Sequence, residues 1–587
     1  MCGIIGVIGN KLPKQSTFEK ARDVLAHRGP DDAGVLYDEE LGVALGHRRL
    51  SIIDLSDAGR QPMFSSDGRY ALVFNGEIYN YLEVRAELAS AHDFKTKTDT
   101  EVLLAAYQVW GADCLQKLNG MFAFAIWDKQ KKEFFCARDR IGIKPFYYAI
   151  RNKCFYFASE IKGLLALGIP AQPNEQVLFD YLYYSVHDHL DETFFGAIQK
   201  LPAGHFGVWK ENKLSVTRYW DLSDQTSRES AAMSLEEAKE RLGSLLTDSL
   251  RLRFRSDVPI GLNLSSGLDS NALLCFGEQV IKKSMHTFSR CFASEEYNEC
   301  SIIKDALTDE QKKFWHTVTF TPDEARALAE PMNAIQDEPF SGIPTIGGMK
   351  PYQQARDAGA VVILEGQGVD EILAGYGYYL PEYEKDVHAN TLGNTQPASD
   401  YSQDMTELAG HELVDEQFMK KYFRKLSFPC PFNSNLLNAQ YRDIRYTKIP
   451  KVLRMNDHTS MAFGRELRVP FLDHRIVEFC FALPHNYKIR AGVQKFLLRE
   501  LMAAYIPDAL RAKPKKSFGA VQNEWMRRHY RDWVYTILDS DSFRSRPYWN
   551  QRALRERVER FFGGMGDNSF FIWQTINIEY WFRKFID

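Results

Sequence analysis

The chain has no long apolar run and no excess of charge of one sign. Its best apolar run, Gly359–Leu364, has the length of a strand, whereas a membrane span needs about 18 apolar residues. Lys and Arg number 73 against 77 Asp and Glu, a net charge of −4. These absences exclude a membrane protein and argue against a nucleic-acid binder with a basic surface. At roughly 150 residues per domain, the 587 residues predict two to four domains.

Cysteine is scarce, and its spacing excludes two further classes of protein. The nine cysteines are an odd number with no CxxC pair, which argues against both a disulfide framework and a zinc ribbon. The N-terminal MCGIIGVIGN lacks the basic region and long apolar core of a secretory signal. We therefore expect a cytoplasmic protein in which most thiols are small buried hydrophobic groups, with Cys2 as the exception.

The first 200 residues have the texture of layered sheets and helices rather than of a doubly wound fold. Apolar spacing predicts helices over 81–91 and 100–110. Short apolar or alternating runs, separated by Gly, Asp and Asn, predict strands at Cys2–Ile8, Tyr70–Phe74, Met121–Trp127, Phe134–Ala137 and Cys154–Phe157.

The second half has a different pattern. The polar stretch 220–234 is typical of a linker. A strand at Val258–Leu264, a Ser/Gly turn and a helix over 271–283 are followed by a second buried strand at Val361–Leu364. Strand, turn and helix in repetition predict a parallel α/β sheet. From Tyr441 onward the pattern is mostly helical, and the polar residues 380–415 predict a mobile loop.

Cys2 is a candidate nucleophile. Removal of Met1 would leave its thiol beside a free α-amine. The ordinary pKa of an α-amine, near 8, lets it act as general base toward that thiol. The alternative is a cysteine that merely begins a buried strand, and one residue does not decide between them.

Polar groups at the ends of the neighbouring predicted strands favour the nucleophile. Asn75 and Gly76 offer a side-chain amide and a backbone N–H for an oxyanion hole. Arg49 suits a carboxylate, and Glu77 and Asp99 suit an ammonium. Each charge alone could be a solvated surface group, but together they describe a site for an amino acid with a cleavable side chain.

These segments, MCGIIG, HRGPDD, RLSIIDLS, FNGEIYNY and TDTE, resemble the glutaminase domain of class II glutamine amidotransferases of the asparagine synthetase family. The resemblance implies an α+β N-terminal-nucleophile αββα sandwich. It also implies that Cys2 attacks the glutamine amide while Asn75 and Gly76 hold the oxyanion. The implied glutamine-binding residues are Arg49, Leu50, Ile52, Asn75, Gly76, Glu77 and Asp99.

A nucleotide site is predicted at LNLSSGLDSN (262–271), between a strand and a helix. Small residues let backbone N–H groups approach phosphates, and the helix N-terminus favours anions. Asp269 suits Mg²⁺, although an ordinary helix-capping turn is the alternative. The segment is similar to the SGGxDS loop of ATP pyrophosphatases, which join the glutaminase in the same family. DEPF (337–340), LEGQGVDEILAGY (364–376), RMNDHTSMAFGRELRVPFLDH (454–474) and QKFLLRE (494–500) follow in the family's order.

The resemblance assigns roles here as well. It implies that ATP is cleaved to AMP and pyrophosphate, that Asp269 and Asp370 bind Mg²⁺ and that Lys495 is catalytic in adenylation. Arg468 is assigned to the structural or the phosphate-facing scaffold without a choice between them. The expected domains are 2–205 (glutaminase), 206–234 (linker) and 235–587 (α/β parallel-sheet synthetase with a helical C-terminal part). The expected ATP-binding residues are Leu264, Ser265, Ser266, Gly267, Asp269, Ser270, Arg290, Glu365 and Gly366.

The sequence departs from the family at three positions. Ser266 stands where the family usually has Gly, which a negative φ would allow. EGQGVDE replaces the usual SG(D/E)GxDE, so Glu365 replaces a small residue and Gln367 replaces an acid. A glutamine amide cannot take a proton as a carboxylate does. The missing charge either comes from Glu365 or is not needed.

The expected activity is amidation of a carboxylate through an acyl adenylate, with ammonia from glutamine passing through an internal tunnel. Aspartate is the first expectation for the acceptor. A non-amino-acid carboxylate such as a sugar uronic acid is the alternative, since Gln367 fits an acceptor without an ammonium. A β-lactam-forming relative fits less well because Cys2 is intact, and a regulatory protein with an inert second domain remains a competing class. The resemblance also suggests a homodimer, with no nucleic-acid or membrane partner.

Overall fold

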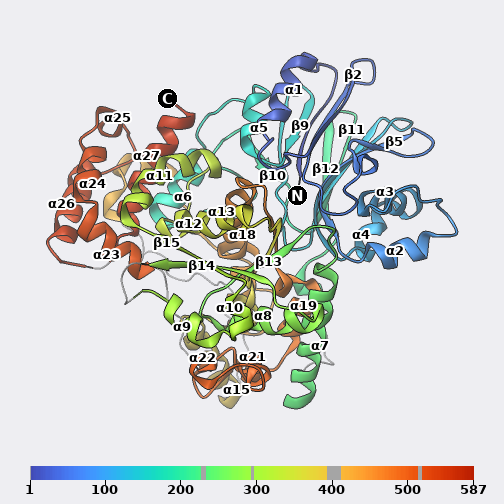
Figure 1. Cartoon of the computed structure of the whole chain (residues 1–587). Helices are drawn as coiled ribbons and strands as arrows, with labels where there is room; N and C mark the ends of the chain where they lie inside the picture. The colour runs from blue at the N-terminus through green and yellow to red at the C-terminus, as the bar shows by residue number, and fades with distance from the viewer. Residues whose placement is uncertain (1, 226–232, 293–296, 393–410, 513–518, 567) are drawn as a thin grey trace.

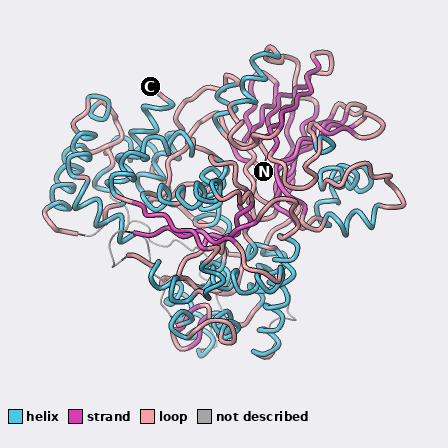
Figure 2. Tube along the Cα trace, in the orientation of Figure 1, coloured by secondary structure: helices cyan, strands magenta, loops and turns pink. Residues whose placement is uncertain are grey.

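The computed structural model describes residues 2–225, 233–292, 297–392, 411–512, 519–566 and 568–587. The N-terminal third forms two stacked sheets, and the remainder surrounds a third sheet with helices (Figure 1). Figure 2 shows the strands in magenta, one group in the N-terminal part and another, the third sheet, among the helices of the remainder.

The first two sheets are antiparallel, with six strands each. One has the order β10-β8-β9-β1-β3-β2 and the other β12-β11-β7-β6-β5-β4. Their bounds are β1 Gly3–Ile8, β2 Asp32–Asp38, β3 Val43–Arg49, β4 Met63–Phe64, β5 Tyr70–Ile78, β6 Gly120–Asp128, β7 Glu133–Arg138, β8 Tyr147–Arg151, β9 Cys154–Ala158, β10 Gln199–Lys200, β11 His205–Lys210 and β12 Lys213–Arg218. Because β11 and β12 belong to the second sheet, this sheet extends past the expected boundary at residue 205.

Helices cover the outer faces of both sheets, which gives four layers. Phe18 of α1 (Gln15–Asp23) and Leu164 of α5 (Ile161–Ala166) pack with Ile5 on the outside of the first sheet. Residues of α2 (Tyr81–Leu88) and α3 (Asp99–Trp110) pack on the outside of the second. Alternate residues of β1, β3, β5, β6, β7 and β9 form a separate apolar layer between the sheets, as alternation along strands requires. The predicted αββα sandwich is confirmed.

The third sheet is parallel and has five strands in the order β15-β14-β13-β16-β17. Their bounds are β13 Ile260–Asn263, β14 His286–Phe292, β15 Trp315–Phe320, β16 Val362–Leu364 and β17 Glu466–Arg468. Helices on the chain around this sheet include α7 Leu235–Arg253, α8 Leu268–Ile281, α9 Cys300–Ala306, α11 Pro322–Gln336, α13 Met349–Asp357, α14 Val369–Ile372, α17 Asn435–Arg442, α18 Ile449–Met461, α19 His474–Ala482 and α21 Phe496–Met502.

The C-terminal part is helical, as predicted. Its helices gather at one end of the molecule in Figure 1. The long α27 is buried along most of its length, with Trp573 and Trp581 fully enclosed. The bounds are α23 Gly519–His529, α24 Arg531–Leu538, α25 Asp541–Arg544, α26 Gln551–Phe562 and α27 Phe570–Phe585.

Two expectations need correction. The predicted loop over 380–415 begins inside a helix, α15 (Tyr379–Leu392), and residues 393–410 lie outside the described residues, as do 226–232 of the expected linker. Cys291 and Cys300 form a disulfide rather than being free buried thiols. The spacing of nine residues gave no sign of this pair, because β14 and α9 bring the two cysteines together only in the fold. Among the described residues, no helix is long and apolar enough to cross a membrane.

Candidate functional site

Cys2 lies directly before β1 and is buried, with 8% of its surface exposed. Its backbone nitrogen donates to Asn75 Oδ1 at 3.1 Å, and its sulfur lies 4.0 Å from the Leu50 carbonyl oxygen. Burial raises the pKa of the thiol, and the charge of the chain's amino group opposes that rise. Loss of Met1 would turn the nitrogen that Asn75 now holds into an α-amine beside the thiol, the arrangement that the sequence predicts.

Asn75 and Gly76 are in β5, on the sheet opposite Cys2. Asn75 is fully buried, and its Nδ2 donates to Ser159 Oγ at 3.5 Å. Gly76 has φ +157°, and a Cβ there would lie 2.1 Å from the carbonyl oxygen of Met121 on β6. Only glycine fits this close approach of two strands. The stacking of the two sheets thus places Asn75, one of the two predicted oxyanion donors, against the predicted nucleophile.

The loop after β3 supplies the next three predicted residues. Leu50 and Ile52 are both buried. Arg49, at the end of β3, donates from Nη1 to the Ser56 carbonyl at 2.7 Å and from Nη2 to the Asp54 carbonyl at 2.5 Å. Its guanidinium therefore holds the loop 53–56 and pairs with no carboxylate in the part of the chain that the structure describes, so its predicted contact with glutamine stays a prediction.

Glu77 and Asp99 form an acidic pair beside these groups. Asp99, the first residue of α3, accepts from the Ile78 N–H at 2.9 Å. Burial raises the pKa of Asp99 to about 6 and raises that of Glu77 well above its ordinary value, with Glu466 of β17 adding to both shifts. Buried carboxylates of this kind suit an ammonium ligand, which restores the lost solvation.

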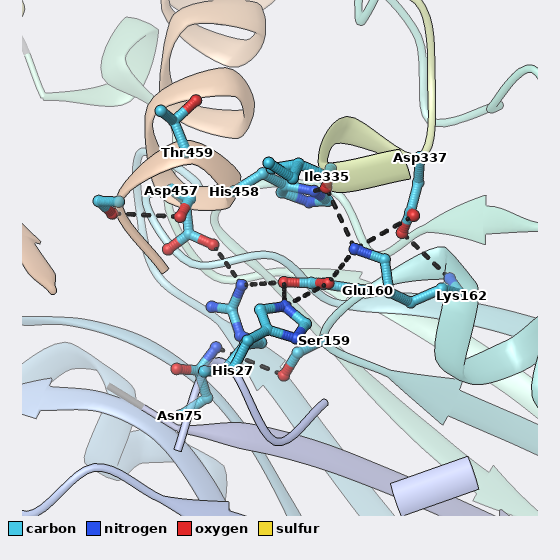
Figure 3. A network of polar contacts seen from close by, with 12 residues as sticks. His27, Asn75, Ser159, Glu160, Lys162, Ile335, Asp337, Asp457, His458 and Thr459 are labelled. Atoms are coloured by element: carbon cyan, nitrogen blue, oxygen red, sulfur yellow. Dashed lines mark hydrogen bonds and ion pairs between the residues drawn. The ribbon is translucent and has the colours of Figure 1, made fainter. Parts of the chain in front are cut away.

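A buried polar network surrounds the carbonyl of Cys2 and reaches the second domain. Arg28 donates from Nε to the Cys2 carbonyl at 3.1 Å and pairs with Glu160 at 2.7 Å and with Asp457 of α18 at 2.8 Å. Figure 3 shows Glu160 between His27 and Lys162, with Asp337 on the far side of Lys162.

Glu160, Asp337 and His458 have their ligand atoms within 4.8 Å of one another, a spacing that a metal could use. The Lys162 ammonium, however, lies 2.7 Å from Glu160 and 3.3 Å from Asp337, so a side chain already supplies the positive charge. We assign this cluster to the domain interface.

The second site lies at the carboxyl ends of β13 and β16. A cavity of about 470 Å³ is bordered by eight of the predicted nucleotide-site residues: Leu264, Ser265, Asp269, Ser270, Arg290, Glu365, Gly366 and Asp370. Ser266 and Gly267 do not line it. Ser266 is buried and its N–H donates to Glu299 at 3.3 Å, while Gly267 is the exposed N-cap of α8. Ser266 is not among the residues with positive φ, which explains why serine is tolerated there.

Lys495 brings the two predicted metal ligands together. Its ammonium lies 2.8 Å from Asp269 and 2.7 Å from Asp370, and these two carboxylates raise its pKa against the effect of burial. Because both carboxylates converge on one cation, the donor set fits a divalent ion carried by ATP phosphates. Lys495 has φ +53° and is the N-cap residue of α21, and its ammonium pairs with two carboxylates that border the cavity.

Glu365, which stands where the family pattern has a small residue, lines this cavity. Its carboxylate accepts from Asn263 (2.5 Å), Tyr352 (2.5 Å), Asn456 (3.0 Å) and Gln367 (3.3 Å). Burial raises its pKa, and the four neutral donors oppose the rise. A carboxylate therefore does face the cavity although position 367 is an amide.

Sequence reasoning missed several residues of both sites. Asn263 and Asn456 lie in the quoted LNLSSGLDSN and RMNDHT segments without an assigned role, whereas Tyr352 carries no motif signal. Arg28 lies in the quoted HRGPDD segment, whose contact with Cys2 only the fold reveals. Arg468, left open between two roles, does not border the cavity. It is fully buried between the domains and pairs with Glu466 at 2.6 Å.

The fold and the two sites define a glutamine amidotransferase joined to an ATP-dependent synthetase. Residues 1–220 match the family model "Glutamine amidotransferase domain", and residues 241–583 match "Asparagine synthase". The chain belongs to the asparagine synthetase (glutamine-hydrolysing) family.

Curated relatives agree with this assignment. Glutamine-hydrolysing asparagine synthetase 1 of Bacillus subtilis is 29% identical over 99% of this chain and 97% of its own length. Glutamine-hydrolysing asparagine synthetase 2 of the same organism is 32% identical over 88% of this chain and 72% of its own. "Amidase chry2" of Gibberella zeae is 26% identical over 89% and 90%. The chain is thus a glutamine amidotransferase of the asparagine synthetase type.

Proposed function

We propose that the protein hydrolyses glutamine at Cys2 and uses the ammonia to amidate aspartate, giving asparagine. The observation that carries the proposal is that one chain holds both sites: Cys2 beside Asn75, and Lys495 between Asp269 and Asp370. Glutamine would supply ammonia at the first site, and ATP would activate the acceptor at the second.

In the first site, the Cys2 sulfur would attack the glutamine amide carbon while Asn75 Nδ2 and the Gly76 N–H hold the developing oxyanion. The α-amine would take the thiol proton and pass it to the leaving ammonia. Water would then release glutamate from the thioester. Glu77 and Asp99 would hold the glutamine ammonium, and Arg49 its carboxylate.

In the second site, an acceptor carboxylate oxygen would attack the α-phosphorus of ATP, and pyrophosphate would leave. Asp269 and Asp370 would hold Mg²⁺, which supplies charge neutralisation on the phosphates. Lys495 would then turn from these carboxylates toward the phosphates. Ammonia would attack the acyl adenylate and release AMP.

Glu365 favours an amino-acid acceptor. The non-amino-acid alternative was suggested by the amide at Gln367, but Glu365 places a buried carboxylate in the same cavity. Its partners are hydroxyl and amide donors, so its charge is available to an acceptor ammonium or to an attacking ammonia. Aspartate therefore stays the first choice, and a sugar uronic acid the second.

The test is pyrophosphate release with Mg-ATP and glutamine, with and without aspartate, with mass detection of the amide. Asparagine formed together with aspartate-dependent pyrophosphate is the expected result. Glutamine hydrolysis without aspartate-dependent pyrophosphate would reject aspartate and move the test to uronic acids. ATP binding with neither acceptor giving pyrophosphate would favour the regulatory alternative.

Cys2→Ala separates the two sites. The variant is expected to lose glutamine-dependent product formation, because the nucleophile is gone, and to keep product formation from ammonium, because the second site is intact. Loss of both activities in a folded protein would contradict the two-site scheme. Wild-type protein with an uncleaved N-terminal tag is the matched control, since it keeps the thiol but blocks the α-amine.

A further inference from the structure

Glu77 and Asp99, the carboxylates assigned to the glutamine ammonium, belong to the first domain. A residue of the second domain, however, contacts Glu77. Arg468, on β17 of the third sheet, is fully buried, and its Nη2 lies 3.6 Å from Glu77 Oε2. Neither of these two atoms makes a hydrogen bond among the described residues. The remaining donors of Arg468 hold Glu466 Oε1 at 2.6 Å and the carbonyls of Arg253 and Arg255 at 2.5 and 2.9 Å.

We propose that the synthetase domain completes the glutamine site, with Arg468 as a positioning residue that keeps Glu77 ionised and aimed at the substrate ammonium. The inference rests on the proposed role of Glu77 in binding glutamine. Within the described ranges, Glu77 Oε2 is a buried acceptor that receives no hydrogen bond, and a substrate ammonium is the donor that it suits.

The charges around Glu77 explain why a guanidinium is needed there. Asp99 on α3 and Glu466 on β17 are two further buried acids beside it, and Arg468 and the chain's amino group are the positive groups that act on it. Glu77 in turn acts on the Cys2 thiol. Without Arg468, three neighbouring carboxyls would be buried with little compensation, and at least one would hold a proton. A protonated carboxyl no longer attracts an ammonium.

The sign of the pH dependence follows from these neighbours. The pKa of Asp99 is raised to about 6 and that of Glu77 is raised well above its ordinary value, chiefly by burial, while Arg468 lowers both. Glutamine binding should therefore weaken as the pH falls through about 6. Loss of Arg468 should move this acid limb to higher pH, and loss of the Glu466 charge should move it to lower pH.

The experiment compares wild type, Arg468→Gln, Glu466→Gln and Arg253→Gln by the pH profile of kcat/KM for glutamine hydrolysis. Arg253 is the matched control: it is buried at the interface like Arg468 and its guanidinium also lies over the Tyr79 ring, but its ion pair is with Asp473. The pH at which kcat/KM falls on the acid side does not depend on how much of the enzyme is folded. We expect a shift of about one pH unit upward for Arg468→Gln, corresponding to about tenfold in kcat/KM at the affected pH. We expect a downward shift for Glu466→Gln and none for Arg253→Gln.

A second readout reports on the ammonium subsite alone. Inactivation of Cys2 by an α-amino-acid diazoketone requires that subsite, whereas alkylation by iodoacetamide does not. Arg468→Gln should slow the first reaction more than the second, whereas Arg468→Lys, which keeps the positive charge, should restore most of the first rate. Equal slowing of both reactions, or limbs that shift in the same direction in Arg468→Gln and Glu466→Gln, would overturn the inference. Absence of glutamine hydrolysis in the wild type would instead reject the proposed function.

Discussion

At the scale of single residues, the second site differs from the family pattern at two positions that bear on acid–base chemistry. Gln367 replaces an acid, and Glu365 supplies a carboxylate two positions earlier. Four neutral donors from four separate segments hold that carboxylate in the cavity. Four hydrogen bonds from neutral donors fix the position of the Glu365 carboxylate and do not cancel its charge.

Glu365→Gln is expected to lower the rate of amide formation by about a hundredfold or more, the usual effect of losing an acid–base group. Glutamine hydrolysis at Cys2 should be unchanged, because the substitution is in the other domain. The measurement is kcat for ammonium-dependent amide formation. Glu365→Gln/Gln367→Glu should recover part of the rate. Tyr352→Phe, which removes a single donor, is the control, and a loss as large as that of Glu365→Gln would show that packing, not charge, is responsible.

Residues of the sites were predictable from sequence to different degrees, for a physical reason. Cys2, Asn75 and Asp269 lie in short continuous motifs, where chemistry and local turn geometry are encoded together. Three of the hydrogen-bond donors to Glu365 are Asn263, Tyr352 and Asn456. They lie far apart in the sequence, and no local pattern shows that they meet. Arg468 stayed open between a structural and a phosphate-facing role, because its contact with Glu77 exists only after the domains dock.

At the scale of elements, the stacking of two sheets creates the first site, and Gly76 lets two neighbouring strands of one sheet pair closely there. β5 and β6 approach so closely at Gly76 that a methyl group has no space. The alternation that predicted strands also explains, once the fold is known, the layer of apolar side chains between the two sheets. It could not predict that the sheet would include β11 and β12, since β12 is largely exposed and carries no apolar stripe.

Gly76→Ala is expected to abolish glutamine hydrolysis and to destabilise the first domain by about 1–3 kcal/mol, because overpacking moves β5 against β6. Thermal unfolding and glutaminase assays check this. Gly68→Ala is the control. Gly68 has φ +69°, but nothing lies within 4 Å of its Cβ position, so the cost there is only that of a left-handed backbone, about 1 kcal/mol. Equal effects at the two glycines would contradict the steric explanation.

A histidine links the two sheets and gives them a pH dependence. His47 of β3 hydrogen-bonds through Nε2 to the Phe74 carbonyl of β5 at 3.1 Å, and burial lowers the pKa of His47 to about 3. The unfolded chain, with an ordinary pKa of 6.5, binds the proton more readily. The neutral imidazole therefore costs stability as the pH falls below 6.5, by about 1.4 kcal/mol per pH unit.

His47→Asn removes this term. The variant should melt below the wild type at pH 7.5, where it has lost packing and a hydrogen bond, and the difference should shrink by about 2 kcal/mol at pH 5.0. Thermal melts at the two pH values measure it. A difference that stays constant or grows at low pH would show that His47 is not the titrating group.

At the scale of the whole molecule, the two domains share buried charges rather than a purely apolar seam. Arg28 contacts the Cys2 carbonyl and pairs with Asp457 on α18, and the preceding residue, Asn456, donates to Glu365. Lys144 of the first domain also pairs with Asp457, at 3.3 Å. One helix therefore contacts groups beside both reaction centres.

Asp457→Asn should loosen this junction, because it leaves Arg28 and Lys144 buried with less compensating charge, a defect that typically costs about 3–5 kcal/mol when a buried pair is broken. We expect the two domains to shift relative to each other while the residues within each site keep their arrangement. Glutamine hydrolysis should then continue while less ammonia reaches the acyl adenylate, so the ratio of glutamate formed to pyrophosphate released should rise above that of the wild type. Asn119→Ala, which removes the hydrogen bond of an uncharged amide to Asp473 across the same interface, should leave the ratio unchanged. A ratio that stays at the wild-type value in a destabilised Asp457→Asn protein would mean that Arg28 and Asp457 hold the domains together without aligning the two reactions.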